Sequence, residues 1–423
     1  MTKDRATSRT SPRHRTSPRR RTAPRHRLGY GSAAAVFAVG MAGTTLPTPL
    51  YGLYRAELGF SELTVTLVFA SYAAGVILTL LLLGDHSDRA GRRPVLLAAL
   101  LFGAASAVCF LLESGLPQLY AGRVFSGFSA GLLSGAGTVT VLELAAPGQR
   151  SRAGFAATAA NMGGLGCGPL LAGFLAEYAP APLILPFVVH LVLLGAACAV
   201  VLLLPETVPE PRPWTRPVPL GLSVPPEVRG VFVPAAVAAF AGFSLMGLFT
   251  AVAPSFLVET LGERNLAVCG LVVFAVFLAS TLGQALTDRV PAGTALPLGC
   301  LVLVAGLLLV GASLWMASLA LLIGGGVCGG LGQGLAFRAG LTAVGAAAPA
   351  AHRAATVSSF FVVAYLGIAV PVIGVGALAM ALDLRDAGLI FTGCAILVAT
   401  ATGLWLWRRR TETVAALPDN PAP

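Results

Sequence analysis

The stretch LLLGDHSDRAGRRPVLL, residues 81–97, ends one apolar run of the sequence and begins the next. Six charged side chains, counting the histidine, lie at positions 85–93, although only 11% of the chain is charged. Gly84 and Gly91 frame them, and glycine permits a tight reversal of the backbone. Asp88 would follow the C-terminus of a helix, where the helix dipole disfavours a negative charge, so it needs a positively charged partner. The stretch therefore predicts a sharp, charged turn between two apolar helices.

The composition of the whole chain predicts a membrane protein. Of its 423 residues 56% are hydrophobic, and the mean hydropathy is +0.82. A soluble protein of this length needs more polar surface to cover its core. The apolar residues also come in runs of about 20, the length of a helix that crosses a bilayer.

The apolar runs fall into two sets of six. We expect membrane helices at residues 31–52, 63–84, 94–113, 118–142, 153–176, 183–204, 231–254, 266–287, 294–312, 317–341, 354–380 and 386–407. The predicted parts are a disordered basic tail (1–27), a six-helix bundle (28–204), a proline-rich cytoplasmic linker (205–229), a second six-helix bundle (230–410) and a short tail (411–423).

The basic residues predict the orientation. With both termini in the cytoplasm, the cytoplasmic segments hold 24 of the 28 Arg and Lys residues. Only Arg55, Arg264 and Arg385 fall in external loops, and Arg123 lies within a helix. This asymmetry follows the positive-inside rule, so we expect a multi-pass protein of the inner or plasma membrane.

Several classes of protein are excluded. Lys3, the only lysine, lies in the tail, so the membrane part has no lysine for a phosphate-binding loop or a Schiff base. The histidines do not cluster and the cysteines lie singly, so we expect no metal, no cofactor and no enzymatic activity. The tail could bind nucleic acid or anionic lipid. We favour an unstructured, positively charged segment and expect no nucleic-acid partner.

The charged turn resembles a known family motif. Gly84, Asp88, Arg89, Gly91, Arg92 and Arg93 match the signature loop of the major facilitator superfamily in residue type and spacing. The resemblance covers roughly 28–410 and implies a transporter with two pseudo-symmetric six-helix bundles. GQALTDRV, residues 283–290, is a degenerate second copy carried by Gly283, Asp288 and Arg289.

The resemblance implies that the charged turn acts as a conformational latch. Glu143 closes the 118–142 helix and could pair with Arg92 or Arg93, while Asp88 could reach Arg353. We expect these pairs to hold while the cytoplasmic side is shut. Alternatively they are surface ion pairs worth less than about 1 kcal/mol.

The segment LYAGRVFSGFSAG, residues 119–131, resembles the arginine-and-glycine motif of the family through Arg123 and Gly127, although Ser126 replaces the usual glutamine. An arginine within the membrane costs about 2.5–3.5 kcal/mol on insertion scales, so it needs a polar neighbour or water. Alternatively it reaches the outer interface. Glu113 is a candidate partner that would carry a coupling proton.

The segment NMGGLGCGPLLAG, residues 161–173, resembles the glycine–proline motif of the family's antiporters. Gly164, Gly168, Pro169 and Gly173 carry the match, and Ala172 stands where glycine is usual. The resemblance implies export. The alternative is ordinary close packing of helices through small residues.

A few polar residues in the apolar helices are candidates for a substrate cavity: Thr45, Asn161, Gln333 and Tyr365. For each, a hydrogen bond to a neighbouring helix is an equally good interpretation. His190 could take up protons, but a neutral histidine between helices is favoured.

Together these features predict a secondary transporter, a proton-linked exporter of small amphipathic compounds that works as a monomer in the bilayer by alternating access. Because no Asp or Glu lies at the middle of a predicted helix, the coupling proton comes from the family resemblance alone. One alternative is an importer or uniporter of a small metabolite. A more distant one is a membrane receptor or scaffold that uses the basic tail.

Overall fold

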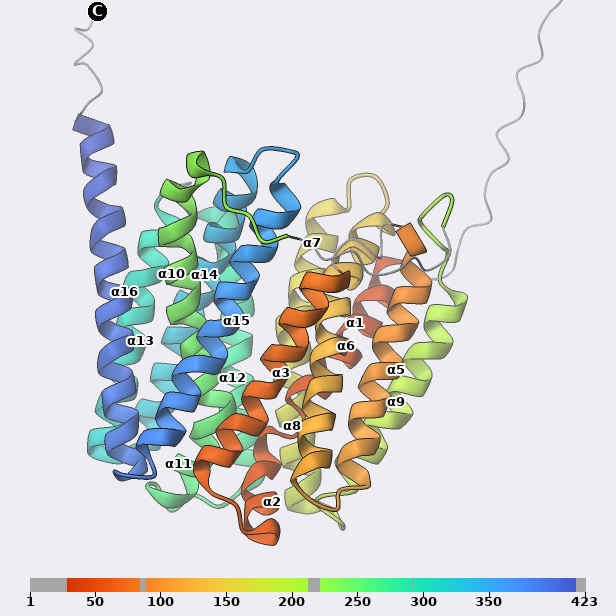
Figure 1. Cartoon of the computed structure of the whole chain (residues 1–423), viewed down its shortest axis with the longest axis vertical. Coiled ribbons are helices and arrows are strands. Elements are labelled where there is room, and N and C mark those ends of the chain that lie inside the picture. Colours follow the sequence, from red (N-terminus) through yellow and green to blue (C-terminus); the bar gives the residue numbers. More distant parts are fainter. Residues whose placement is uncertain (1–28, 84–88, 212–220, 292, 416–423) are drawn as a thin grey trace, which may run out of the picture.

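A computed structural model describes residues 29–83, 89–211, 221–291 and 293–415. In these ranges the regular structure is helical, and twelve spans are long and apolar enough to cross a membrane. They form two groups of six, one from each half of the chain (Figure 1). The predicted all-α membrane fold is confirmed. The predicted tail, Gly84 and Asp88 lie outside the described residues.

In the described part of the first half, eight α-helices form six spans. They are α1 (Tyr30–Thr45), α2 (Tyr51–Leu58), α3 (Glu62–Leu83), α5 (Arg92–Leu111), α6 (Leu116–Glu143), α7 (Arg150–Thr158), α8 (Gly164–Tyr178) and α9 (Leu185–Leu203). The first span joins α1 to α2, and the fifth joins α7 to α8 through a π-helical turn, Ala159–Gly163.

The second half repeats this plan. Its helices are α10 (Arg229–Gly247), α11 (Ala253–Glu259), α12 (Leu266–Leu286), α13 (Ala295–Met316), α14 (Leu319–Ala347), α15 (Arg353–Leu378) and α16 (Leu384–Ala415). A second π-helical turn, Leu248–Val252, joins α10 to α11. Such turns are rare in helices and occur often at functional sites.

The predicted spans agree with the observed ones to within a few residues at most ends. The first span runs on to Leu58, where Gly59 adopts a left-handed φ of 68° and ends the helix. The last helix continues to Ala415, beyond the predicted end at 407. Basic residues from Arg408 onward suggested the membrane surface, but nothing in their chemistry ends a helix.

Helices of one half approach one another closely through small residues. A Cβ added at Gly127 in α6 would meet the carbonyl oxygen of Tyr72 in α3 and lie 2.9 Å from the Cα of Gly75. Membrane helices have little hydrophobic drive to associate and depend on such packing. Gly127, a glycine of the 119–131 motif, thus allows α6 to pack closely against α3.

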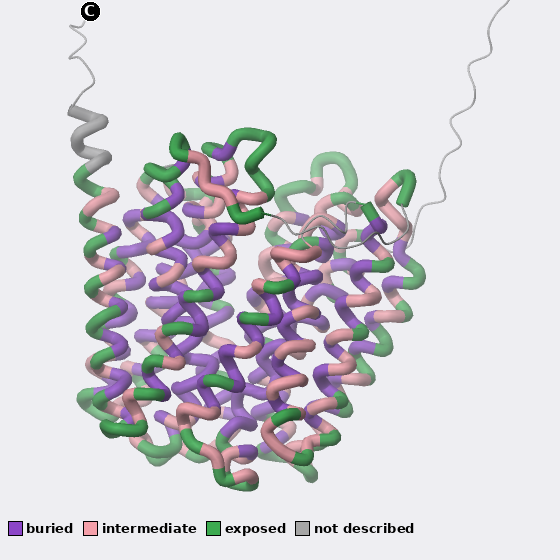
Figure 2. The backbone as a smooth tube through the Cα atoms, in the orientation of Figure 1, coloured by how far each residue is buried: buried purple, intermediate pink, exposed green. Residues whose placement is uncertain are grey.

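The bundle has two distinct ends. The start of α1 and the linker lie beside the end of α6, at the top of Figure 1, and α2 and α11 lie at the opposite end. We call these the linker end and the far end. Buried residues fill the interior (Figure 2), whereas large apolar side chains such as Leu101 and Leu397 are exposed on the outside, which suits a surface that faces lipid.

Candidate functional site

A cavity of about 680 Å³ lies between the two halves. Its lining comes from α1, α3, α6, α7 and α8 of the first half and from α10, α12, α14 and α15 of the second. It reaches the linker end, because Leu142, Leu341 and Val357 lie near the ends of their helices there. The volume falls within the range of about 300–1,000 Å³ of small-molecule sites.

The four cavity residues expected from the sequence line this space: Thr45, Asn161, Gln333 and Tyr365. Thr45 donates from Oγ1 to the carbonyl oxygen of Leu165 at 2.5 Å. The Gln333 Oε1 accepts a hydrogen bond from Ser280 Oγ at 2.6 Å, while its Nε2 has no partner among the described residues. Asn161 lies in the first π-helical turn.

Arg123 also lines the cavity and is 1% exposed. Its Nη1 donates to the carbonyl oxygen of Thr44, in the last turn of α1, and to Ser126 Oγ at 3.4 Å. The guanidinium carbon lies 5.3 Å from the ring centre of Phe69 and 4.7 Å from that of Tyr72. Such contacts stabilise a cation. The side chain therefore points into the protein and does not reach the outer interface.

The expected ion pair between Arg123 and Glu113 is absent from the described structure. Glu113 follows α5 at the far end. Because Arg123 turns toward α1 and α3, its side chain leads away from the α5–α6 connection. The described lining of the cavity contains two arginines, Arg123 and Arg338, and no Asp, Glu, Lys or His.

Aromatic rings form a continuous row across the cavity. From Tyr72 in α3, ring centres are separated by 6.2 Å to Tyr365, then 6.0 Å to Phe243, 5.1 Å to Phe337 and 5.9 Å to Phe361. All five line the cavity. The row begins beneath the Arg123 guanidinium in the first half and ends in the second. Phenylalanines in apolar helices look like core residues in the sequence, so this row was not predicted.

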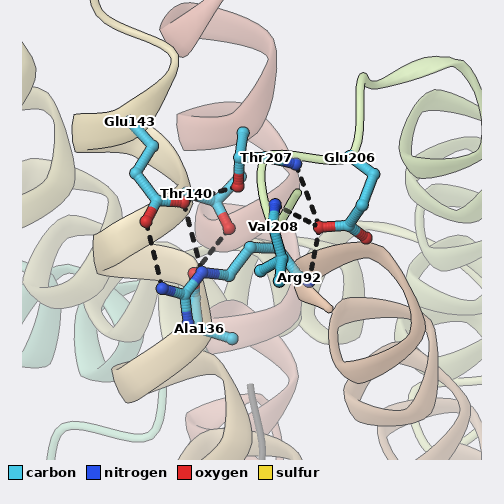
Figure 3. Close-up of polar contacts among 7 residues, drawn as sticks. All are labelled: Arg92, Ala136, Thr140, Glu143, Glu206, Thr207 and Val208. Carbon is cyan, nitrogen blue, oxygen red and sulfur yellow. Dashed lines mark hydrogen bonds and ion pairs between the residues drawn. The ribbon is translucent and has the colours of Figure 1, made fainter. Parts of the chain in front are cut away.

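At the linker end, charged groups join α5, α6 and the linker (Figure 3). Arg92 donates from Nε and Nη2 to the Glu143 carboxylate at 3.2 and 3.0 Å, so the pair expected from the sequence is present. Glu206 accepts from the backbone N–H groups of Arg92 and Arg93 at 2.9 and 3.0 Å, at the N-terminus of α5. Thr207 donates to Glu143 at 2.5 Å. The linker residues Glu206 and Thr207 were not predicted.

The expected role of these residues as a latch stays a prediction, because its other pair, Asp88 with Arg353, includes a residue outside the described ranges. Arg92 and Glu143 belong to the same half, and they are paired while the cavity reaches the linker end. Their contact therefore does not require that end to be shut. Gly91 does make the predicted reversal, with a φ of 99°, and a Cβ there would lie 2.8 Å from a Glu206 oxygen. Arg89 precedes it in the described chain.

The second copy of the motif is also held within its own half. Asp288 Oδ2 lies 3.1 Å from Arg338 Nη2 of α14. A Cβ added at Gly283 of α12 would meet the backbone of Leu331, which also belongs to α14. Arg289 is exposed. The sequence suggested Asp288 but not its partner, because Arg338 counted only as a basic residue near a helix end.

The glycines of α8 serve two different interfaces. A Cβ at Gly164 or Gly168 would strike the backbone of α1 in the same half. A Cβ at Gly173 would strike the carbonyl oxygen of Leu266 in α12, across the boundary between the halves. Pro169 lies within the helix, and its carbonyl faces Gly270 of α12. The motif therefore contributes to the closure of the far end.

Polar contacts across the halves strengthen the far end. Arg55 forms ion pairs with Glu62 of its own half and, at 2.5 Å, with Glu259 of the second half. The Glu177 carboxylate accepts the backbone N–H of Leu266 at 2.8 Å. These contacts were not predicted from the sequence, because they join residues 89 and 204 positions apart.

Two six-helix halves around a central cavity that is closed at one end form the architecture of a secondary membrane transporter. The sequence model of a protein family, the Major Facilitator Superfamily, matches residues 32–310 of this chain. The chain belongs to this family, whose members are transporters and not enzymes, so the family that the sequence resembles is confirmed.

Two curated relatives match shorter stretches. Over 143 residues the chain is 33% identical to the tetracycline resistance protein, class B, of Escherichia coli, which covers 34% of this chain and 35% of that protein. Over 85 residues it is 41% identical to the multidrug resistance protein MdtL of Escherichia coli, 19% of this chain and 22% of MdtL. The matches thus span about a third and a fifth of these relatives.

Solved structures resemble nearly the whole chain in fold. A peptide transporter POT in complex with sulfate has a TM-score of 0.71 at 16% identity, over 90% of this chain and 94% of that one. A bacterial homologue of the human lysosomal transporter Spinster has a TM-score of 0.63 at 15% identity, over 89% of this chain and 95% of that one. The human organic anion transporter MFSD10 has a TM-score of 0.61 at 17% identity, over 90% of this chain and 100% of that one. At these identities the likeness concerns the fold alone.

Proposed function

We propose that this protein exports small amphipathic compounds through the inner membrane by alternating access, linked to the movement of protons. The observation that carries the proposal is the cavity of about 680 Å³ between the halves, which has aromatic and aliphatic walls and a few polar groups. Such a lining suits a drug-sized, partly apolar molecule. The printed names of the two relatives, a tetracycline and a multidrug resistance protein, support the same class of substrate.

The direction of transport rests on the end at which the cavity opens. The positive-inside rule puts the linker end and both termini in the cytoplasm. A compound would then enter the cavity from the cytoplasm, and the far end would open to release it outside. The resemblance of Gly164, Gly168, Pro169 and Gly173 to the antiporter motif supports export and the proton as coupling ion.

The polar clusters have separate roles in this cycle. The cluster at the linker end, Arg92, Glu143 and Glu206, anchors the linker to the first half. The ion pair of Arg55 with Glu259 and the contact of Gly173 with α12 hold the far end closed and must part for release. Each half then moves as a unit about the cavity, as alternating access requires.

The experiment uses everted membrane vesicles from a host that lacks its own drug pumps, loaded with a dye that reports the pH gradient. Antibiotics, dyes and small metabolites are added one at a time. We expect at least one compound to release protons from vesicles that contain the protein, and not from vesicles with Arg123→Ala or without the protein. Nigericin, which collapses the pH gradient, should abolish its transport.

Other outcomes point to the alternatives. Inward accumulation of a labelled metabolite by intact cells, without proton release from vesicles, would replace export by import or uniport. If transport is absent and deletion of residues 1–27 removes the cellular phenotype, the receptor or scaffold hypothesis is the better one.

A further inference from the structure

The cavity contains a buried positive charge without a counter-ion. Arg123 is 1% exposed, its Nη1 is taken by the carbonyl oxygen of Thr44 and by Ser126, and its Nε is buried with no partner among the described residues. No acidic side chain lines the described cavity. A carbonyl dipole and two aromatic rings compensate part of a full charge, but an ion in a low-dielectric site needs a paired ion or water.

The other cationic group of the cavity is in a different situation. Arg338 lies toward the linker end, is about a third exposed, and is already paired with Asp288 at 3.1 Å. The site at Arg123 therefore offers one positive charge without a counter-ion, and the described lining of the cavity has no negative group that would attract a cation.

The geometry of arginine selects the kind of anion. A guanidinium carries five N–H donors in a planar fork, which matches the two oxygens of a carboxylate. The two hydrogen bonds of Arg123 to Thr44 and Ser126 are both donated by Nη1, so the other N–H donors of the guanidinium remain for a ligand. A single fork suits one negative charge, whereas a phosphate ester needs several basic groups.

The row of aromatic rings defines the rest of the ligand. The row starts at Tyr72, on whose ring the Arg123 guanidinium packs, and it crosses to Phe361 in the second half. A molecule with its carboxylate on Arg123 would lay an aromatic or aliphatic body along this row and touch both halves at once. Contact with both halves is what a transported substrate needs to influence their relative movement.

We propose that the substrates are amphipathic organic monoanions, whose carboxylate binds Arg123 and whose apolar body packs on the aromatic row from Tyr72 to Phe361. The identification of these anions as substrates rests on the proposed export function. The binding of the anion to Arg123 does not depend on transport or on its direction. The proposal narrows the substrates from amphipathic compounds in general to those with one negative charge.

The test compares three fluorescent probes that share one apolar body. Dansylglycine carries a charge of −1, its primary amide is neutral, and dansylcadaverine is cationic. Binding to the purified full-length protein in lipid nanodiscs is followed by the rise in dansyl emission. We expect the anion to bind at least about tenfold more tightly than the amide, since charge-assisted bonds are roughly twice as strong as neutral ones. The cation should bind more weakly than the amide.

Two variants connect the preference to the arginine. Arg123→Gln should remove the preference for the anion and leave binding of the amide within about threefold of wild type. Arg123→Lys keeps the charge but not the fork, so it should retain part of the preference. Size-exclusion profiles and melting curves show whether each variant is folded, and amide binding by Arg123→Gln shows that its cavity is intact.

The proposal is overturned if the anion does not bind better than the other two probes, or if a folded Arg123→Gln keeps the preference. These results are separable from those of the vesicle experiment. Anion binding without any efflux would leave the substrate class in place and remove the export function. Proton-linked efflux of neutral or cationic compounds by a protein that shows no binding preference for the anion would leave the export function in place and remove the proposed substrate class.

Discussion

Replacing Gly173 by alanine should shift this transporter away from the conformation that is closed at the far end. Gly173 lies where α8 of the first half meets α12 of the second. An added Cβ would press against the carbonyl oxygen of Leu266 and lie 3.3 Å from the Cα of Ala267. Because these neighbours are backbone atoms, no side-chain rotation can relieve the contact, and the two helices must separate.

The size of the effect follows from packing. Inserting a methyl group into a tightly packed contact costs about 1–3 kcal/mol. The cost applies only while α8 touches α12, so the ratio of closed to open far ends should fall by about 5- to 150-fold. Alanine at Gly270, whose Cβ would meet the carbonyl of Pro169, should act in the same direction. The two changes should be less than additive, because they separate the same pair of helices.

The assay measures distances between spin labels on the two halves, in a background without the seven native cysteines. One pair, Ala56→Cys with Arg264→Cys, reports the far end, and another, Ala146→Cys with Ala351→Cys, reports the linker end. All four positions are exposed. In Gly173→Ala the far-end distances should lengthen and the linker-end distances shorten.

The matched control is Gly163→Ala in the same membrane span, since a Cβ at Gly163 would meet nothing within 4 Å. It should leave both distance distributions unchanged. Unchanged distances in Gly173→Ala, or an equal shift in the control, would refute the reasoning that this glycine holds the halves together.

Three further predictions concern other contacts. Alanine at Arg55 or Glu259 should favour the open far end by about 0.2–1 kcal/mol, since the pair is partly exposed; additive effects in a double-mutant cycle would show that the two residues do not interact. Cysteines at Thr66 and Gly376 should form a disulfide that stops transport until reductant is added, because a Cβ at Gly376 would lie 2.9 Å from Thr66 Cγ2 across the halves. Normal transport by the oxidised protein would contradict opening at this end. Glu206→Gln should speed proteolysis of the linker, because hydrogen bonds to a charged acceptor are worth about 1.5–3 kcal/mol; unchanged resistance would contradict the anchoring role.

The sequence predicted best what depends on composition over a whole segment. The twelve spans follow from the length and polarity of apolar runs, so they were found to within a few residues. The pairing of Arg92 with Glu143 was also within reach, because opposite charges at neighbouring helix ends on one face must find partners nearby. The cavity residues were found because polar side chains in apolar helices avoid lipid.

The sequence could not provide the rotation of each helix about its axis or the docking of the halves. The depth of Arg123 in its helix suggested Glu113 as a partner, but its side chain turns toward α1 and α3 in this structure. The ion pair of Arg55 with Glu259 depends on how two separate bundles meet, which no local pattern encodes. Glu206 was missed for a similar reason, since its role appears only when the linker folds back on α5.

The distribution of ionic contacts indicates where the energy of switching resides. At the linker end, the pairs of Arg92 with Glu143 and of Asp288 with Arg338 stay inside one half and need not change when the halves move. At the far end, the contact between Arg55 and Glu259 crosses the boundary and must break. Among the described contacts, those at the far end and within the cavity are therefore the ones that we expect to change between the two states. The anionic ligand proposed for Arg123 would touch both halves and would act on the balance between the two states, because it could bind them with unequal affinity.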